Sequence, residues 1–314
     1  MSSPRSSAFT DAELEAEAYK TSEFEIQFSE LLFREEISHG SFGVVHLGEW
    51  KGQEVAIKEI RTSSKDERMQ RIMILQLRRE IASLNRIQHP NIVRLIGAAF
   101  VPPKVALVTE FIKGKTLLDF LRAFAEGTPD RGQILETAIK VSLQISWGMS
   151  FAHSLQIIHR DLKSPNVMIE ADTSRVVIID FGSARVVHSR DSHMTKGVGS
   201  FRWIAPELFQ SSLYNEKVDV YSFGVMLWEC LHPGSIPLPH YSPIEAAYAA
   251  AHRKVRPQVT IALPSAFGKL LRACWSHDPK HRPSFQAITD ILENQTASLL
   301  KTPKSSSMRT LFGR

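Results

Sequence analysis

The sequence predicts an α+β fold in which a five-stranded antiparallel sheet with one main helix precedes a mainly helical region. Three observations predict it. Short runs of β-branched residues, bounded by glycine turns, occupy the first third of the 314 residues. One stretch with the helical period of apolar residues interrupts them. From about residue 114 onward, apolar residues recur mainly at helical spacing.

The first strands follow one another closely. The strand pattern begins at Leu31 and continues through Val44–Leu47 and Glu54–Ile60, with a turn at the glycines of residues 48–52. Residues 66–87 then carry apolar side chains at helical intervals, which predicts the one helix of this part. His89-Pro90-Asn91 ends that helix, because the residue before a proline avoids the helical conformation.

Two more strands and several helices complete the predicted fold. The strands are expected at Ile92–Ile96 and Val105–Thr109. Amphipathic patterns predict helices at Leu117–Glu126, Leu135–His153, Tyr214–Leu231 and Pro264–Trp275. Short apolar strands at Val167–Ile169 and Val176–Ile179 interrupt this helical region and bracket its densest polar motifs.

Composition and charge indicate an intracellular, cytoplasmic globular protein. Hydrophobic residues make up 43% and charged residues 23%. The net charge of +5 is modest, so we expect no nucleic-acid partner. The two cysteines predict reduced thiols, and neither a signal peptide nor a membrane span is visible. Residues 1–30 are expected to form a partly disordered N-terminal extension, and residues 294–314 a flexible basic tail.

A glycine-containing turn and a lysine suggest a phosphate site. Gly40-Ser41-Phe42-Gly43 lies between two strands, so it is either an ordinary tight hairpin or a loop that closes over phosphates. Its strand context argues against the strand-to-helix loop of a dinucleotide fold. Lys58, in the next strand, would be a solvated charge on its own. Glu80 on the following helix offers a partner that would point Lys58 at the phosphates.

The strongest chemical signal is His159-Arg160-Asp161-Leu162-Lys163-Ser164-Pro165-Asn166. Phosphoryl transfer needs a carboxylate that takes a proton from the attacking hydroxyl, which Asp161 offers. It needs a cation near the γ-phosphate and oxygen ligands for Mg²⁺, which Lys163 and Asn166 offer. Asp180, in Asp180-Phe181-Gly182 at the end of an apolar strand, is a natural second metal ligand.

These motifs, in this order, resemble those of the eukaryotic protein kinase family. Ala205-Pro206-Glu207 and Asp219-Val220-Tyr221-Ser222-Phe223-Gly224 extend the resemblance, which covers about residues 31–293. It implies a two-lobed domain, with an N-lobe at 31–109, a hinge at 110–113 and a C-lobe at 114–293. It also implies a buried ion pair between Glu207 and Arg282, ATP and Mg²⁺ as cofactors, and proteins as substrates.

The resemblance also assigns roles to individual residues. It implies that Asp161 is the catalytic base, that Lys163 assists at the γ-phosphate, and that Asn166 and Asp180 bind Mg²⁺. Lys58 and Glu80 would form an activating ion pair. The residues that it implies for ATP binding are Ile37, Gly40, Gly43, Val45, Ala56, Lys58, Thr109, Glu110, Ile112, Thr116 and Met168.

Finer features narrow the group within the family. Lys163-Ser164 is similar to serine/threonine kinases, whereas residues 199–207 and Cys274-Trp275 look like tyrosine kinases. This mixture resembles the tyrosine kinase-like group, to which Raf-like and mixed-lineage kinases belong. We therefore expect a serine/threonine kinase, with a tyrosine or dual-specificity kinase as the first alternative. A pseudokinase scaffold is the second, although Lys58, Asp161 and Asp180 are all present.

Two features bear on activity and its control. Ser38 replaces the first glycine of the family's loop pattern. Arg160 directly precedes the catalytic Asp161 and is a ready partner for a phosphate on the segment between Asp180 and Glu207. Thr195 is the hydroxyl we favour there, so an upstream kinase is a candidate partner. The sequence predicts nothing about the oligomeric state.

Overall fold

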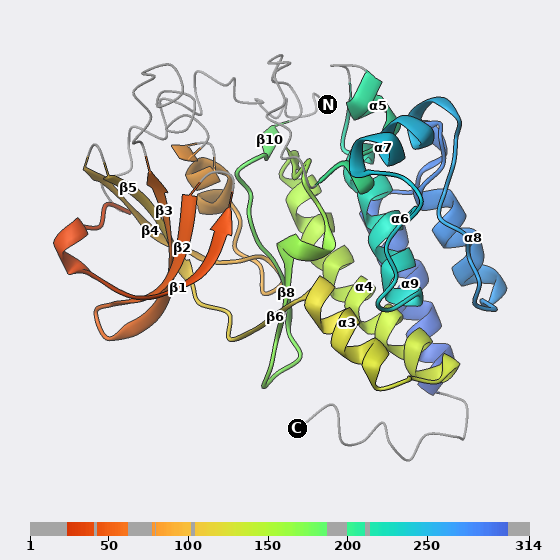
Figure 1. The fold of residues 1–314 in the computed structure, drawn as a ribbon, viewed down its shortest axis with the longest axis horizontal. Coiled ribbons are helices and arrows are strands. Elements are labelled where there is room, and N and C mark those ends of the chain that lie inside the picture. Colours follow the sequence, from red (N-terminus) through yellow and green to blue (C-terminus); the bar gives the residue numbers. More distant parts are fainter. Residues whose placement is uncertain are drawn as a thin grey trace, which may run out of the picture.

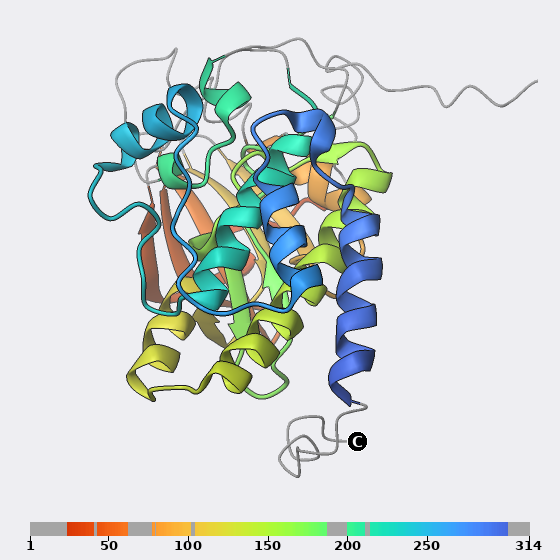
Figure 2. The ribbon, with the colours of Figure 1, turned by 90° about the vertical axis from the view of Figure 1, so that its right-hand side faces the viewer.

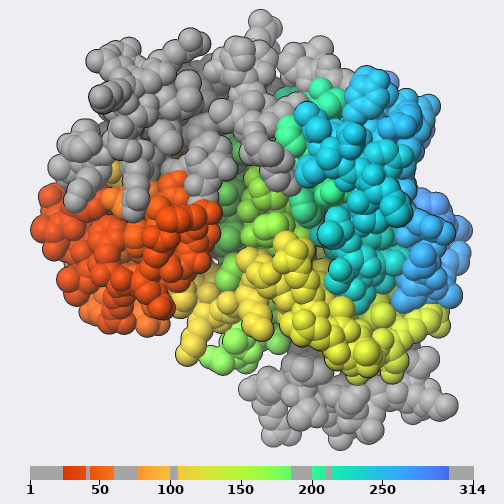
Figure 3. Space-filling model, in the orientation of Figure 1, coloured from red at the N-terminus to blue at the C-terminus, as the bar shows by residue number. Residues whose placement is uncertain are grey.

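The computed structural model describes residues 24–40, 43–61, 77–78, 80–101, 104–186, 200–210 and 214–300. A five-stranded sheet forms one end of the molecule and a group of helices the other, as Figure 1 shows. In the space-filling view of Figure 3 the sheet residues are red and orange, and the helical residues run from yellow to blue. The predicted α+β architecture is confirmed. Some predictions concern residues outside these ranges: residues 1–23 of the predicted extension, residues 301–314 of the tail, and Thr195.

The sheet has the predicted five strands, all antiparallel, in the order β1-β2-β3-β5-β4. Its strands are β1 (Leu31–Gly40), β2 (Gly43–Trp50), β3 (Gln53–Arg61), β4 (Leu95–Val101) and β5 (Lys104–Glu110). The turn between β2 and β3 consists of Lys51 and Gly52, whose φ angles are 49° and 79°. Positive φ at both residues is what a two-residue hairpin turn of type I′ needs.

The strand predicted at Ile92–Ile96 is misplaced, because β4 begins only at Leu95. Ile92 instead makes an isolated bridge to Ile178 in the helical part, and the Val93 amide donates to the Ile178 carbonyl at 2.9 Å. The apolar residues 92–96 therefore contact two different parts of the molecule. The first of these residues tie the N-lobe to the C-lobe, and only the last ones enter the sheet.

The segment before β1 packs on the sheet. The Ile26 amide donates to the Ala98 carbonyl at 2.9 Å, and the Ala98 amide donates to the Phe24 carbonyl at 2.8 Å. Ile26 is buried against the face of the sheet that carries Val55 and Ile57. The folded unit thus begins before residue 31, where the sequence placed its boundary.

The helices of the C-lobe are α3 (Leu117–Glu126), α4 (Arg131–Ser154), α5 (Pro206–Gln210), α6 (Lys217–Leu231), α7 (Pro243–His252), α8 (Ser265–Cys274) and α9 (Phe285–Leu300). Four of them, α3, α4, α6 and α8, lie close to their predicted positions, whereas α5, α7 and α9 were not predicted. α3 matches its prediction to the residue, because Thr116 accepts the Asp119 amide and caps it. α4 begins four residues earlier than predicted, where Asp130 and Gln133 form a reciprocal capping box.

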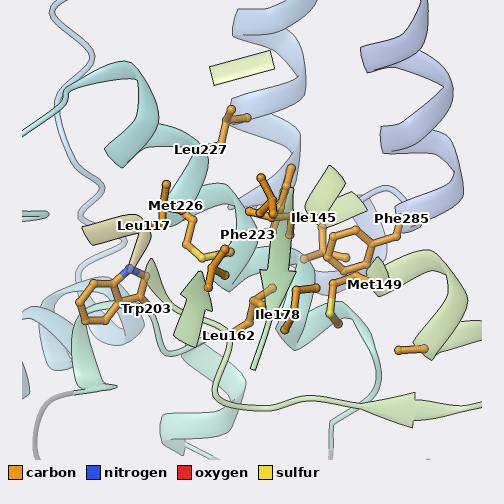
Figure 4. Close-up of a cluster of buried hydrophobic side chains, with 14 of the residues drawn as sticks. Leu117, Ile145, Met149, Leu162, Ile178, Trp203, Phe223, Met226, Leu227 and Phe285 are labelled. Carbon is orange, nitrogen blue, oxygen red and sulfur yellow. The ribbon is translucent and has the colours of Figure 1, made fainter. Parts of the chain in front are cut away.

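The C-lobe core lies between α4, α6 and α9. In Figure 4, Phe223 of α6 lies close to Ile145 and Met149 of α4 and to Phe285 of α9. The Phe223 and Phe285 rings meet edge to face, with centroids 5.4 Å apart. α9, blue in Figure 2, continues to Leu300. The predicted start of a flexible tail at residue 294 therefore falls inside a helix.

Short strands position the polar motifs at the junction of the two lobes. β7 (Ile157–Ile158) pairs with β10 (Arg185–Val186). β6 (Gly114–Thr116), β8 (Val167–Glu170) and β9 (Val176–Ile178) form a second small sheet. The 159–166 motif connects β7 to β8, and Asp180 follows β9, so both polar motifs emerge at the same place.

The ion pair expected between Glu207 and Arg282 is present. The Arg282 guanidinium donates to both carboxylate oxygens of Glu207, at 2.5 and 2.9 Å. The Arg282 side chain is fully buried. A bidentate pair of this kind joins α5 to the loop before α9 and fixes the segment around Ala205.

Candidate active site

A cavity of about 950 Å³ separates the sheet from the helical lobe. Strands β1, β2, β3 and β5 contribute one wall, and β6, β8 and the 160–166 segment contribute the other. Most of the residues predicted to bind ATP line this cavity: Ile37, Gly43, Val45, Ala56, Lys58, Thr109, Glu110, Ile112, Thr116 and Met168. Gly40 pairs with Gly43 where β1 and β2 meet.

Lys58 lies between two carboxylates. Its Nζ donates to Glu80 at 3.2 Å (Oε1) and 3.0 Å (Oε2), and to Asp180 Oδ1 at 2.9 Å. β3 supplies the lysine, and the buried Glu80 lies among helical residues 77–78 and 80–86. The structure therefore brings together three residues that lie far apart in the sequence.

The electrostatics of this triad follow from its burial and from its single shared cation. Burial raises the pKa of Glu80 to about 7, with Asp180 adding to the rise and Lys58 opposing it. Burial would lower the pKa of Lys58, but the two carboxylates outweigh it and raise that pKa. Burial would likewise raise the pKa of Asp180, yet the ammonium of Lys58 holds it at about 2. Asp180 is thus ionised at neutral pH, as a metal ligand must be.

A buried aspartate of α6 holds residues 159–166, the predicted catalytic segment. The amides of His159 and Arg160 each donate to Asp219 at 2.8 Å, and His153 Nε2 lies 2.9 Å from its Oδ2. The Arg160 backbone has a φ of 65°, which costs strain in a residue with a side chain. The hydrogen bonds to Asp219 compensate for that strain and fix the turn from which Asp161 projects.

Asp161, Lys163 and Asn166 meet in the cavity. Lys163 Nζ donates to Asp161 Oδ2 at 2.7 Å and to Ser200 Oγ at 2.6 Å. Asn166 Nδ2 donates to the Asp161 carbonyl at 2.9 Å and to Oδ2 at 3.1 Å. The amide nitrogen of Asn166 is thereby committed, which turns its Oδ1 into the free ligand atom of that side chain.

Asn166 and Asp180 fit a magnesium site. The Ile179 amide donates to the Asn166 carbonyl at 2.9 Å, which ties the strand leading to Asp180 to the 3₁₀ turn that carries Asn166. The Asp180 side chain keeps 37% of its surface exposed toward the cavity. Within the described ranges, no group of three or more His, Cys, Asp or Glu side chains would hold a metal alone. Two hard oxygen ligands plus nucleotide phosphates and water are what Mg²⁺ usually takes.

Arg160 has partners that the sequence did not indicate. Its Nε donates to the Ser183 carbonyl at 2.5 Å, and its Nη1 donates to Tyr214 Oη at 2.7 Å. Ser183 lies three residues after Asp180, whereas Tyr214 lies three residues before the start of α6. No motif marks Tyr214, so sequence reasoning missed it. Arg160 thus links the catalytic segment to two other segments of the C-lobe.

Ser38 lines the cavity opposite Val45 of β2. Ser38→Gly is expected to hold or raise ATP affinity, since a residue without a side chain lets the strand lie closer to a nucleotide. Titration of purified protein with a fluorescent ATP analogue would measure the affinity. Ser38→Ala is the matched control, because it removes the hydroxyl and keeps the backbone restricted. A large loss of affinity in both variants would show that the hydroxyl itself contacts the nucleotide.

Comparison with known proteins agrees with this arrangement. The family model described as "Protein tyrosine and serine/threonine kinase" matches residues 31–292. A probable serine/threonine-protein kinase of Dictyostelium discoideum is 37% identical over 271 residues, which cover 86% of this chain and 28% of that protein. A serine/threonine/tyrosine-protein kinase of Arabidopsis thaliana is 33% identical over 303 residues, 93% of this chain and 76% of that protein.

A third relative is named as a kinase of the mitogen-activated protein kinase kinase kinase type. Mitogen-activated protein kinase kinase kinase 7 of Homo sapiens is 37% identical over 271 residues, which cover 85% of this chain and 42% of that protein. The chain thus spans less than half of two of these three relatives. None of the helices in the described residues combines the length and the apolar character that crossing a bilayer requires. The expected resemblance to the tyrosine kinase-like group is confirmed by these relatives. The chain belongs to the protein tyrosine and serine/threonine kinase family.

Proposed function

We propose that this chain transfers the γ-phosphate of ATP to a serine or threonine hydroxyl of a protein substrate. One observation carries the proposal: Lys163 Nζ lies between Asp161 Oδ2 and Ser200 Oγ, at 2.7 and 2.6 Å, in the cavity that the ATP-binding residues line. The proposed base and cation are thereby held together with the Ser200 hydroxyl within one hydrogen-bonded unit. Phosphoryl transfer depends mostly on such positioning and on charge stabilisation.

Each residue then has a role that follows from its surroundings. Asp161 orients the acceptor hydroxyl and takes its proton as the oxygen–phosphorus bond forms. Lys163 stabilises the negative charge of the transferring phosphoryl group. Lys58, held by Glu80 and Asp180, orients the α- and β-phosphates. The backbone at Glu110 and Ile112 would bond the adenine, with Val45, Ala56 and Met168 packing on its faces.

The protein kinase family uses ATP with Mg²⁺. In this chain Asn166 and Asp180 would hold the ion, which would neutralise phosphate charge when bound. Lys58 already contacts Asp180 Oδ1, so the lysine also sets the orientation of that carboxylate. The residues present therefore fit the cofactor that the family requires.

Serine or threonine is favoured over tyrosine as the acceptor. The Lys163-Ser164 pattern after Asp161 is similar to that of serine/threonine kinases. The Dictyostelium discoideum relative named as a probable serine/threonine-protein kinase supports the same choice. Phosphoamino-acid analysis of a protein substrate and of autophosphorylated enzyme tests this: phosphoserine and phosphothreonine are expected. Phosphotyrosine as the main product would establish the tyrosine alternative.

A pseudokinase scaffold is the rival from another class. Such a protein would bind partners, and in some cases ATP, without transferring phosphate. The triad of Lys58, Glu80 and Asp180 is complete and correctly assembled, which favours an active enzyme. ATP binding with no measurable transfer to any of a panel of serine, threonine and tyrosine peptides would favour the scaffold.

Control by phosphorylation of Thr195 is part of the proposal. A phosphate of nearly −2 charge on that residue would pair with the Arg160 guanidinium. In the described residues Arg160 already holds Ser183 and Tyr214, so the phosphate would add to or replace the tyrosine hydroxyl. Phosphatase-treated enzyme is expected to lose most of its activity and to regain it with ATP as phosphate returns to Thr195. Full activity in phosphatase-treated protein or in Thr195→Ala would contradict this control.

A further inference from the structure

A buried carboxylate outside the catalytic motifs joins two parts of the active site. Glu229 of α6 is 2% exposed. Its Oε1 accepts from Ser164 Oγ at 2.9 Å, and its Oε2 accepts from Trp203 Nε1 at 2.7 Å. Both donors are neutral, and burying a carboxylate among neutral donors costs free energy. A costly buried group that bridges two segments deserves a functional explanation.

The two donors belong to the segments that hold Lys163. Ser164 is the next residue after Lys163 in the catalytic segment. Trp203 donates its amide to the Ser200 carbonyl at 3.2 Å, and Ser200 Oγ accepts from Lys163 Nζ at 2.6 Å. The contacts therefore form a closed ring, which runs from Lys163 through Ser200, Trp203, Glu229 and Ser164 back to Lys163. Breaking the ring at Glu229 would leave Lys163 as the one remaining link of this ring between the catalytic segment and residues 200–203, as far as the described residues show.

We propose that Glu229 is a positioning residue for phosphoryl transfer, which fixes the spacing between the catalytic segment and residues 200–203 so that Lys163 stays between Asp161 and Ser200. This inference rests on the proposed kinase function. Glu229 itself touches no substrate, because it lies behind Trp203 and Ser164 and does not line the cavity. Its effect passes through the hydroxyl and the indole that it holds.

The role requires hydrogen bonding rather than charge. Burial raises the pKa of Glu229 to about 7, while the bonds from Trp203 and Ser164 oppose the rise, as does the charge of Arg122 on α3. A protonated Glu229 still accepts from the indole with one oxygen and can donate to Ser164 with the other. Glutamine has the same arrangement of one acceptor and one donor. Glu229→Gln should therefore keep the ring, whereas Glu229→Ala opens it.

A stability profile checks the protonation step separately. A carboxyl whose pKa is raised on folding favours the folded state at low pH, and this contribution fades as pH rises from 4.5 to about 7. Glutamine does not titrate. The melting temperature of Glu229→Gln should therefore match that of the wild type near pH 4.5 and exceed it by roughly several degrees at pH 8. A constant difference across this range would show that burial does not raise the pKa of Glu229.

Kinetics of three variants test the positioning role. At saturating ATP and peptide, Glu229→Ala should lower kcat about 10- to 100-fold, as expected for misplaced catalytic groups, with the KM for ATP nearly unchanged. Glu229→Gln should stay within about threefold of the wild type, since it restores both hydrogen bonds. Glu126→Ala, which removes an exposed glutamate at the end of α3, is the matched control and should have no effect.

Ser164→Ala keeps the test decisive if Glu229→Ala fails to fold. It removes one donor and a single oxygen atom, and kcat should again fall with the KM for ATP preserved. Wild-type kcat in both Glu229→Ala and Ser164→Ala would overturn the inference, and so would equal losses in the glutamine and alanine variants. An inactive wild type that still binds ATP would instead refute the proposed kinase function, so the two failures are distinguishable.

Discussion

Asp161→Asn is expected to reduce kcat by about 10²- to 10⁴-fold, the usual contribution of a general base. The amide keeps the shape of the carboxyl but cannot take the proton of the acceptor hydroxyl. Asn166 and Lys163 both donate to Asp161 Oδ2, so the variant will turn its amide oxygen toward them and retain the local fold. ATP affinity should change little, because the adenine and phosphate contacts lie on other residues.

The measurement is a peptide phosphorylation assay at saturating substrates, together with ATP binding and thermal melting of the same preparations. Asp172→Asn is the matched control, since Asp172 is an exposed aspartate in the turn between β8 and β9. It should leave all three quantities unchanged. If Asp161→Asn kept more than about a tenth of the wild-type turnover, Asp161 would not be the base.

Local signals explain what could be predicted from the sequence. α3 was predicted to the residue because an amphipathic run follows a threonine that caps it. The β2–β3 hairpin was predictable because Gly52 marks its turn. The candidate site residues were predicted from short motifs, each of which lies within one turn or one strand end. Most of the predicted ATP-binding residues consequently line a single cavity.

Contacts between distant segments explain the rest. Ile92 is as apolar and β-branched as any strand residue, and only its bridge to Ile178 removes it from the sheet. Glu229 binds Ser164 across 65 positions of sequence, and Tyr214 binds Arg160 across 54. A single sequence carries no mark of such pairs. Their discovery requires the fold, because the same residue types occur elsewhere as ordinary surface or core groups.

Lys58→Met is expected to lower kcat by about 10²-fold or more, the usual cost of removing one group that stabilises transition-state charge. The change removes the cation that lies between Glu80 and Asp180, and the two carboxylates then face each other unscreened. Glu80, whose pKa is already raised to about 7, will hold its proton more tightly. Asp180 loses the ammonium that orients Oδ1, so the metal ligand is also misplaced.

ATP affinity should fall far less than turnover in Lys58→Met, because the hinge and the apolar residues of the cavity remain in place. Steady-state kinetics and nucleotide titration separate these two effects. Lys269→Met, at an exposed position of α8, is the matched control.

Glu80→Gln tests the ion pair from the other side. It keeps Lys58 and Asp180 but leaves the lysine without its buried carboxylate partner, so kcat should fall as well. Unchanged activity in Glu80→Gln would show that Asp180 alone suffices to position Lys58, and the role of the ion pair would then be wrong.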